Sequence, residues 1–583
     1  DAHASSHPAT AAAVDDGGTW TYEQLRLASL QAAAWLRTQL PGLVGQPAPA
    51  WSTCPGAPRP LAIAITRGRV WYSLCIAAWR LGLATVAVSS DMPDKAAEGQ
   101  RNARIARELR PLAVVVDGAP EAVLPGRPED CAVLQVDKLL RALHVDAPFE
   151  GLAPAPAALG EVSPVSPDSV LTYVYTGGTT RHSKCVVITH AMALWEMANY
   201  ATALHGSVHQ NDRWLQFSSA YWGAAVFGQL DVGLAFGACI VFSTLHSVED
   251  IAEATSRHGI TVLGVVPSQL RGAWPGGPKT RPPCLRVLIA WADKLPVKLA
   301  QQWKEHVQIF ELLIASEYWL TFYSDCSTWQ DPADGSTRHV LQALPGLDMQ
   351  LLKEDGSSAT DGQVGELLLT GATVSPGYVG PDGRVGTGAE NEAAFTQIGG
   401  RRFYRTRDRL RRLHGGGYVY MGRAGTLAKR GGAWVDLEAI EAAVSSVPGI
   451  SSAAVVATEE VNAFLVIEPS RQGKRMPLLR LLDRARRAVG GESHVHVRAA
   501  LPVHPATAKV DRRKIQEELS DARARAAFDQ AFLHRMQCRM LLSYCAWYVL
   551  IVAAVAGPAC ILYSPTAALG VVAMKLLLLP YLW

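Results

Sequence analysis

The segment Tyr175-Thr176-Gly177-Gly178-Thr179-Thr180-Arg181-His182-Ser183-Lys184 connects two apolar runs, residues 170–175 and 185–189, which have the composition of buried β-strands. A loop rich in glycine and threonine can surround phosphate oxygens with backbone N–H groups and hydroxyls. Lys184 adds a positive charge at the end of the loop. The Walker A spacing G-x-x-x-x-G-K-[ST] is absent, and a Gly/Thr-rich loop taken alone is more often an ordinary turn. Phosphate binding therefore needs support from other parts of the chain.

The residues before this loop predict an α/β domain with a parallel sheet. Thr21 is placed to cap a helix that runs to Leu40. Residues 61–65, 71–81 and 85–88 predict a strand, a helix that ends at Gly82, and a second strand, which together form a βαβ unit. Further buried strands are expected at residues 114–116 and 133–136. The stretch 151–168, rich in Ala, Pro and Gly, is interpreted as a linker.

Short motifs follow the loop in order along the rest of the chain. They are Ser316-Glu317, Gly365-Glu366-Leu367, Gly377-Tyr378, Tyr404-Arg405-Thr406-Arg407-Asp408, Gly422-Arg423, Ile440-Glu441 and Lys509-Val510-Asp511. This ordered set resembles the adenylate-forming, or AMP-binding, superfamily of acyl-CoA synthetases, luciferases and peptide-synthetase adenylation domains. The resemblance covers about residues 18–517. It implies an α/β fold, with a large adenylate-forming N-terminal domain and a small α+β C-terminal domain.

The resemblance also implies a reaction, in which a carboxylate attacks the α-phosphate of ATP to give an acyl-adenylate and pyrophosphate. Two anions must meet, so catalysis depends on charge neutralisation and positioning. By motif position, the nucleotide would be bound by Thr176, Gly178, Thr179, Thr180, Lys184, Ser316, Asp408 and Arg423. Among these, Lys184 would hold the pyrophosphate side, Asp408 the ribose hydroxyls and Arg423 the nucleotide oxygens. Glu317, with Thr179, would hold Mg²⁺, and Lys509 would reach the α-phosphate and the substrate carboxylate.

Several positions depart from the pattern of the superfamily. Arg181 and Cys185 replace glycines of the loop, and Arg407 replaces the glycine before Asp408. An arginine costs of order 1 kcal/mol where a site needs a positive φ. Leu313-Ile314 stands where the superfamily carries Tyr-Gly, so an aromatic stack on adenine is expected to be lost. Gly425 replaces the usual hinge aspartate. These departures favour weaker ATP binding.

The acyl substrate is less well defined by the sequence. Amino-acid-activating relatives carry Phe-Asp in the segment that corresponds to residues 217–222, and that acid is absent here. No carrier-domain serine motif follows Lys509. Both observations disfavour a peptide synthetase and favour a fatty or aromatic acid. Tyr221, Trp222, Phe227 and Trp291 are candidates for an apolar pocket, although core packing is the more common role for each of them.

Composition excludes some classes of function. The chain has 583 residues, with 55 Lys+Arg against 52 Asp+Glu, a net charge of +3 that gives no reason to expect nucleic-acid binding. The ten cysteines show no CxxC pair or zinc spacing, so buried free thiols are expected.

The apolar excess lies near residue 550. Residues 540–562 carry no formal charge, and this run is long enough to cross a bilayer. Residues 566–583 carry a single charge, that of Lys575. We expect one transmembrane helix or a helical hairpin in residues 540–583. The preceding Arg523, Arg525, Arg535 and Arg539 place the body on the cytoplasmic, matrix or stromal side of the membrane.

Seven of the twelve residues 401–412 are arginine. A solvated strand face is the simplest interpretation. Contact with anionic lipid, with coenzyme A phosphates or with an acidic partner protein are the alternatives.

The sequence thus predicts four segments: a large AMP-binding domain (1–422), a small mobile C-terminal domain (423–517), a basic juxtamembrane helix (518–539) and the membrane segment (540–583). Two functions remain open. The first is a membrane-anchored acyl-CoA synthetase that uses ATP, Mg²⁺, a carboxylic acid and coenzyme A. The second is a catalytically degenerate fold that serves as an accessory subunit of a membrane complex.

Overall fold

The computed structural model describes residues 1–42, 56–89, 95–143, 165–176, 183–226, 228–245, 247–328, 340–423, 427–430, 433–445, 447–457, 461–467, 478–490, 493–502 and 510–520. The chain divides into two compact units, Asp1–Ala424 and Gly425–Trp583. The sequence had placed this boundary between residues 422 and 423. The expected linker at 151–168 lies almost entirely outside the described residues.

A six-stranded sheet of the first unit carries the Gly/Thr-rich loop. Its strands, in spatial order, are β6 (Ala132–Gln135), β5 (Ala113–Val116), β3 (Leu61–Ala64), β4 (Thr85–Ala87), β7 (Val170–Tyr175) and β8 (Cys185–Thr189). The first five run parallel, whereas β8 is antiparallel to β7. Because β3, β5, β7 and β8 are buried along their whole length, their apolar runs fit a sheet that is covered on both faces. The predicted βαβ unit is confirmed, with α3 (Arg69–Arg80) between β3 and β4. Val136, predicted to end a strand, instead begins α6 (Val136–Ala142).

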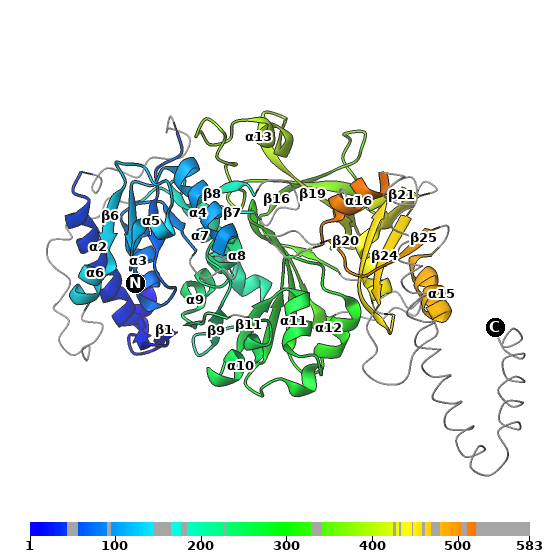
Figure 1. Ribbon diagram of the computed structural model, residues 1–583, viewed down its shortest axis with the longest axis horizontal. Helices are drawn as coiled ribbons and strands as arrows, with labels where there is room; N and C mark the ends of the chain where they lie inside the picture. Colours follow the sequence, from blue (N-terminus) through cyan, green and yellow to red (C-terminus); the bar gives the residue numbers. More distant parts are fainter. Residues whose placement is uncertain are drawn as a thin grey trace, which may run out of the picture. The chain divides into compact units, whose positions relative to one another are not determined.

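A nine-stranded sheet forms the second layer of this unit (Figure 1). Its order is β15 (Gln342–Ala343), β14 (Tyr318–Asp325), β13 (Gln308–Ala315), β12 (Val287–Ala290), β11 (Val262–Val265), β9 (Arg213–Gln216), β10 (Cys239–Phe242), β1 (Ala11–Asp15) and β2 (Gly18–Thr21). The six strands from β13 to β1 pair in parallel, and β14, β15 and β2 pair antiparallel at the edges.

Helices cover both sheets. The other helices of the first unit are α1 (Ala2–Ser6), α2 (Tyr22–Gln39), α4 (Lys95–Leu109), α5 (Pro120–Val123), α7 (His190–Ala203), α8 (Gly223–Val226), α9 (Asp231–Phe236), α10 (Asp250–Arg257), α11 (Pro267–Ala273), α12 (Val297–Trp303) and α13 (Ala389–Ala394), with 3-10 turns at Pro278–Thr280 and Cys326–Thr328. Thr21 caps α2 as predicted, and its side chain and that of Gln24 form a capping box. Helices α10, α11 and α12 pack on one face of the nine-stranded sheet (Figure 1). The larger core contains side chains of both sheets and of α2, α3 and α7.

A smaller sheet completes the first unit. It contains β16 (Asp348–Leu352), β17 (Val364–Thr370), β19 (Arg401–Arg412) and β18 (Phe395–Ile398), and β20 (Tyr418–Arg423) pairs with β19. In the second unit, β21 (Leu427–Arg430) pairs with β22 (Ala433–Asp436), and β23 (Ile450–Ala457), β24 (Val461–Ile467) and β25 (Ser493–Arg498) form a three-stranded sheet. Helices α14 (Leu437–Ser445), α15 (Leu478–Val489) and α16 (Arg512–Ser520) pack with this sheet. The second unit is therefore the expected α+β domain.

The predicted membrane segment, residues 540–583, and most of the basic segment 518–539 lie outside the described residues. Among the residues that the structure does describe, no helix is long and apolar enough to cross a bilayer. The six described cysteines are all free thiols, and all but Cys284 are buried.

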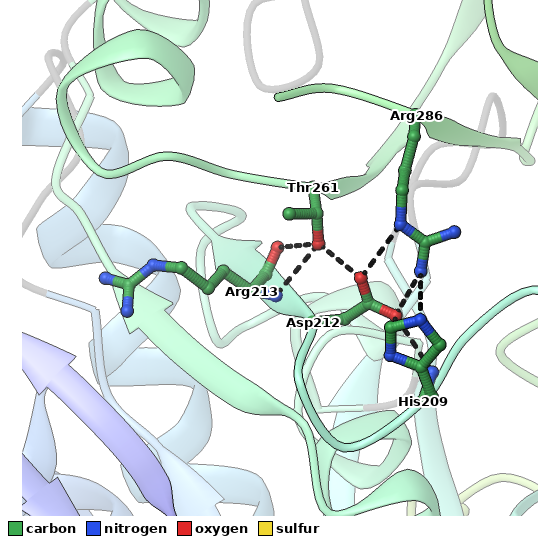
Figure 2. Close-up of polar contacts among 5 residues, drawn as sticks. All are labelled: His209, Asp212, Arg213, Thr261 and Arg286. Atoms are coloured by element: carbon green, nitrogen blue, oxygen red, sulfur yellow. Dashed lines mark hydrogen bonds and ion pairs between the residues drawn. The ribbon is translucent and has the colours of Figure 1, made fainter. Parts of the chain in front are cut away.

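A buried carboxylate ties three parallel strands of the nine-stranded sheet together at their amino ends. Asp212, 1% exposed, precedes β9, and its Oδ1 accepts a hydrogen bond of 2.6 Å from the Thr261 hydroxyl beside β11. The guanidinium of Arg286, beside β12, donates to both carboxylate oxygens, and the His209 backbone N–H donates to Oδ2 at 2.8 Å. Figure 2 shows these contacts converging on Asp212. The network therefore ties together the amino ends of β9, β11 and β12.

We expect Asp212→Asn to lower the free energy of unfolding by about 2 kcal/mol. The amide keeps the shape of the side chain, but it loses the charge that binds Arg286. Its NH2 group, itself a donor, would also face the N–H donors that now bind the carboxylate. Chemical denaturation measures the effect. Glu253→Gln, which alters an exposed carboxylate paired with Arg257 on α10, is the control and should change stability by less than about 0.5 kcal/mol. Equal effects of the two variants would contradict a structural role for Asp212.

Candidate functional site

Hydrogen bonds join the two ends of the Gly/Thr-rich loop. Thr176 follows β7, and its hydroxyl oxygen accepts from the Lys184 N–H at 3.0 Å. The Thr176 N–H donates to the Lys184 carbonyl at 3.0 Å, and the Ser183 hydroxyl donates to the Thr176 carbonyl. The loop therefore has a fixed base. Gly178, Thr179, Thr180 and Arg181 lie outside the described residues, so their roles stay predictions.

Lys184 and Glu317 both contact the side chain of Tyr378. Ser316 and Glu317 form the tight turn between β13 and β14. The Lys184 Nζ is 4.6 Å from the centre of the Tyr378 ring, and the Tyr378 hydroxyl donates to Glu317 Oε1 at 2.8 Å. Burial and the charge of Glu317 raise the pKa of Tyr378, so that this hydroxyl keeps its proton and acts as a donor. The predicted phosphate-binding lysine and the predicted metal ligand are thus neighbours.

The segment 374–378 brings these groups together. The Val187 N–H of β8 donates to the Gly377 carbonyl at 3.1 Å, and the Ser375 hydroxyl donates to the Val187 carbonyl at 2.7 Å. On the other side, the Ser375 N–H donates to the Glu317 carbonyl at 2.8 Å. A single segment therefore joins the six-stranded sheet to the β13–β14 turn, which explains how residues far apart in sequence meet.

Asp408 is buried and accepts hydrogen bonds from two tyrosines. Its side chain lies on β19 and is 3% exposed. Its Oδ2 accepts from the Tyr318 hydroxyl at 2.6 Å, and its Oδ1 accepts from the Tyr420 hydroxyl at 3.1 Å. Burial and the charge of Asp408 raise the pKa of Tyr318, which therefore remains a donor. Both oxygens expected to bind the ribose are thus engaged by the chain itself.

Arg423 supplies the positive charge beside Asp408. The register of β19 and β20 places the two residues opposite each other, and the Arg423 Nε is 3.9 Å from Asp408 Oδ1. Burial opposes the charged form, but Asp408, Tyr318, Tyr404 and Glu317 together outweigh this penalty and raise the pKa of Arg423. Since the Arg423 side chain is half exposed, water screens this attraction, and the guanidinium remains accessible to a ligand.

The structure thus brings together six of the predicted site residues within the first unit: Thr176, Lys184, Ser316, Glu317, Asp408 and Arg423. Lys509 belongs to the second unit and lies outside the described residues. The sequence argument missed Tyr318, Tyr378 and Tyr420 as site residues. Two of them could have been predicted as site residues from the sequence, because Tyr318 directly follows Glu317 and Tyr378 ends the Gly377-Tyr378 motif.

Four of the seven arginines of β19 form ion pairs within the chain. Arg405 pairs with Glu366 of β17, Arg409 with Glu354, and Arg401 with Asp348 of β16. Arg412 pairs with Asp361. These pairs support the simplest interpretation of the cluster, a solvated strand face, and count against lipid, coenzyme A or an acidic protein as the reason for it.

Arg407 adopts a backbone conformation that suits glycine. It lies in an irregular stretch of the β17–β19 pairing with a φ of 64° and an exposed side chain. A left-handed conformation costs an L-residue roughly 1 kcal/mol or more. The arginine that replaces the superfamily glycine at position 407 therefore carries backbone strain.

We expect Arg407→Gly to raise the free energy of unfolding by about 0.5 to 1 kcal/mol, since relief of strain exceeds the added flexibility of the unfolded chain. Arg407→Ala keeps the Cβ and should give no comparable gain. Denaturant titration of the three proteins measures this, and equal stability of the glycine and alanine variants would contradict the strain.

The donor set fits magnesium nucleotide chemistry. Mg²⁺ prefers oxygen ligands and commonly takes one or two carboxylates together with water and substrate phosphates, a role open to Glu317. Among the described residues, no group of three or more His, Cys, Asp or Glu side chains could hold a metal ion. A cation beside a carboxylate of the type that binds Mg²⁺, and an acceptor beside an arginine, are groups that can hold a metal-bound nucleotide.

A family model described as AMP-binding enzyme matches residues 1–379. The chain belongs to the AMP-binding enzyme family, as the motifs had indicated. The nonribosomal peptide synthetase Ao415 of Arthrobotrys oligospora is 28% identical over 290 residues, which cover 49% of this chain and 8% of that protein. The dapdiamide synthesis protein DdaD of Enterobacter agglomerans is 24% identical over 318 residues, 54% of this chain and 53% of DdaD. These relatives include a peptide synthetase, a class that the sequence had disfavoured, and the match spans 8% of Ao415 and about half of DdaD.

Solved structures share the fold. NpsA of Klebsiella oxytoca in complex with 3-hydroxyanthranilyl-AMSN aligns with a TM-score of 0.66 at 19% identity, over 89% of this chain and 98% of NpsA. The o-succinylbenzoate coenzyme A synthetase MenE of Bacillus subtilis, in complex with ATP and a magnesium ion, aligns with a TM-score of 0.65 at 18% identity, over 88% of this chain and 98% of MenE. The expected α/β adenylate-forming architecture is therefore confirmed.

Proposed function

We propose that this protein uses MgATP to activate a carboxylic acid as an acyl-adenylate with release of pyrophosphate. The observation that carries the proposal is the convergence of Lys184, Glu317 and the Asp408–Arg423 pair around three buried or half-buried tyrosines. Two carboxylates and two cations in one place match the needs of a reaction between anions on a metal-bound nucleotide.

Each group has a defined part in this reaction. When bound, Mg²⁺ neutralises phosphate charge, and Glu317 would hold it while the Tyr378 hydroxyl orients the carboxylate. Lys184 attracts the phosphates, and Tyr378 fixes it through the face of its ring. Arg423 binds nucleotide oxygens. Asp408 accepts the ribose hydroxyls in exchange for the hydroxyls of Tyr318 and Tyr420. Lys509 is proposed to act on the α-phosphate and the substrate carboxylate.

The acid is proposed to lack a charged amino group. The Arg67 guanidinium donates to the Ser218 carbonyl and to the Gln216 side chain, within the segment where amino-acid-activating relatives carry an aspartate. A cation at this place repels an ammonium group. A fatty or aromatic acid is therefore preferred, followed by transfer to a thiol such as coenzyme A.

Two of the apolar pocket candidates are engaged in core packing. Trp291 is 4% exposed and follows β12, and it lies against Gly264 of β11 so closely that a Cβ there would stand 1.8 Å from its ring. Tyr221 is 5% exposed and stacks on Tyr175 with ring centres 4.8 Å apart. Trp222 is half buried, and Phe227 lies outside the described residues.

A second candidate function is an accessory subunit that has lost catalysis. The engagement of both Asp408 oxygens by tyrosine hydroxyls favours it, as does Leu313 on β13 in place of an aromatic residue. In either case, we propose that residues 540–583 anchor the chain in a membrane, with the body on the cytoplasmic, matrix or stromal side, where other membrane subunits would meet it.

Titration calorimetry with MgATP separates the two functions. The enzyme requires binding in the micromolar to millimolar range, weakened by Arg423→Met through loss of the charge that meets the nucleotide. Arg257→Met, an exposed residue of α10, is the control. Absence of MgATP binding in the wild-type protein would favour the accessory subunit.

A further inference from the structure

Helix α15 of the second unit has one buried face and one basic face. Leu481, Ala485 and Val489, spaced four residues apart, pack into the core of this unit. The opposite face is exposed and contains Leu479, Arg480, Asp483, Arg484, Arg486 and Arg487. Packing explains the first face but not the second.

The exposed face, which we call the α15 face, concentrates positive charge. Its four arginines face one acid, Asp483, which pairs with Arg487. Arg480 and Arg484 are four residues apart, an arrangement of like charges that destabilises an isolated helix. This arrangement contrasts with β19, where Glu366 of β17 pairs with Arg405 and Glu354 pairs with Arg409. An external anionic surface would relieve the repulsion.

The same face carries an unusually exposed apolar side chain. Leu479 is 80% exposed and is one of two large hydrophobic residues, with Leu194, that are prominently exposed among the described residues. An apolar side chain among arginines is typical of helices that lie at a lipid headgroup boundary, where the cations meet phosphate and the apolar group enters the acyl region.

We propose that the α15 face binds the anionic headgroups of a membrane surface. The inference rests on the proposed anchoring through residues 540–583. α16 ends at Ser520, and the chain from there to residue 540 spans at most about 70 Å when fully extended. A tether of this length keeps the second unit close to the bilayer, so even weak electrostatic attraction is effective.

The test uses the full chain in nanodiscs of phosphatidylcholine alone or mixed with phosphatidylserine. Hydrogen exchange in peptides that cover residues 478–489 should slow at least threefold in the anionic nanodiscs relative to the neutral ones. High salt should abolish the difference, because the contact is electrostatic. Exchange in α2 should be the same in both lipids.

Two charge reversals make the test specific. Arg480→Glu with Arg484→Glu should remove the protection, whereas Arg271→Glu with Lys279→Glu, exposed residues of the first unit, should preserve it. Incorporation into neutral nanodiscs reports on the anchor independently of α15. Equal exchange in both lipids, an equal loss in the control variant, or protection by nucleic acid or an acidic protein but not by anionic lipid would overturn the α15 proposal. Protein that neither enters nanodiscs nor floats with anionic vesicles would contradict both the anchor and the α15 face.

Discussion

Replacing Asp408 with alanine is expected to reduce ATP–pyrophosphate exchange at least about 100-fold and to destabilise the protein. The carboxylate is the acceptor proposed for the ribose, and the loss of hydrogen bonds to a charged group costs about 1.5 to 3 kcal/mol each in binding. Stability falls by about 2 to 3 kcal/mol, because the buried Tyr318 hydroxyl loses its acceptor. Exchange rates and denaturation midpoints measure the two effects separately.

Controls separate the loss of binding from the loss of folding. Asp361→Ala removes an exposed carboxylate that pairs with Arg412 and should leave both quantities nearly unchanged. Exchange by Asp408→Ala is measured well below its melting temperature, with the native state confirmed by circular dichroism. Exchange within threefold of the wild type under these conditions would remove Asp408 from the nucleotide site.

Glu317→Gln is expected to lower the exchange rate about 100-fold without a loss of stability. The amide oxygen can still accept from the Tyr378 hydroxyl, so the fold keeps its hydrogen bond, but the neutral side chain holds Mg²⁺ poorly. A 100-fold loss corresponds to about 2.7 kcal/mol of transition-state stabilisation, a typical contribution for one electrostatic partner. The Mg²⁺ concentration for half-maximal exchange should rise.

The matched control is Glu354→Gln, which neutralises a carboxylate on the surface beside Arg409. It should leave both the rate and the Mg²⁺ requirement unchanged. A Glu317→Gln variant with wild-type Mg²⁺ dependence would show that the metal is held elsewhere.

The sequence predicted the strands of the six-stranded sheet well because buried parallel strands are continuous apolar runs bounded by turns. The runs that became β3, β5 and β7 were found in this way. The motif order also identified Glu317, Asp408 and Arg423 as neighbours. The antiparallel pairing of β19 and β20 around the glycines at 415–417 explains one of these contacts.

The tyrosines of the site could not be found by the same reasoning. Tyr318 and Asp408 are separated by 90 residues, and their contact depends on how two sheets pack, which no local pattern records. The ion pairs of the β19 arginines have the same origin, since Glu366 faces Arg405 only through the register of another strand. Local patterns therefore predicted the elements, whereas tertiary packing decided the partners of each polar side chain.

ATP–pyrophosphate exchange with a panel of fatty, aromatic and amino acids tests the central claim most directly, because the exchange requires adenylate formation on the protein. The account predicts exchange that depends on Mg²⁺ and on a fatty or aromatic acid, and that is abolished by Lys509→Ala. No exchange with any acid under conditions where the protein is folded would contradict the claim, and exchange with amino acids alone would contradict the proposed substrate class.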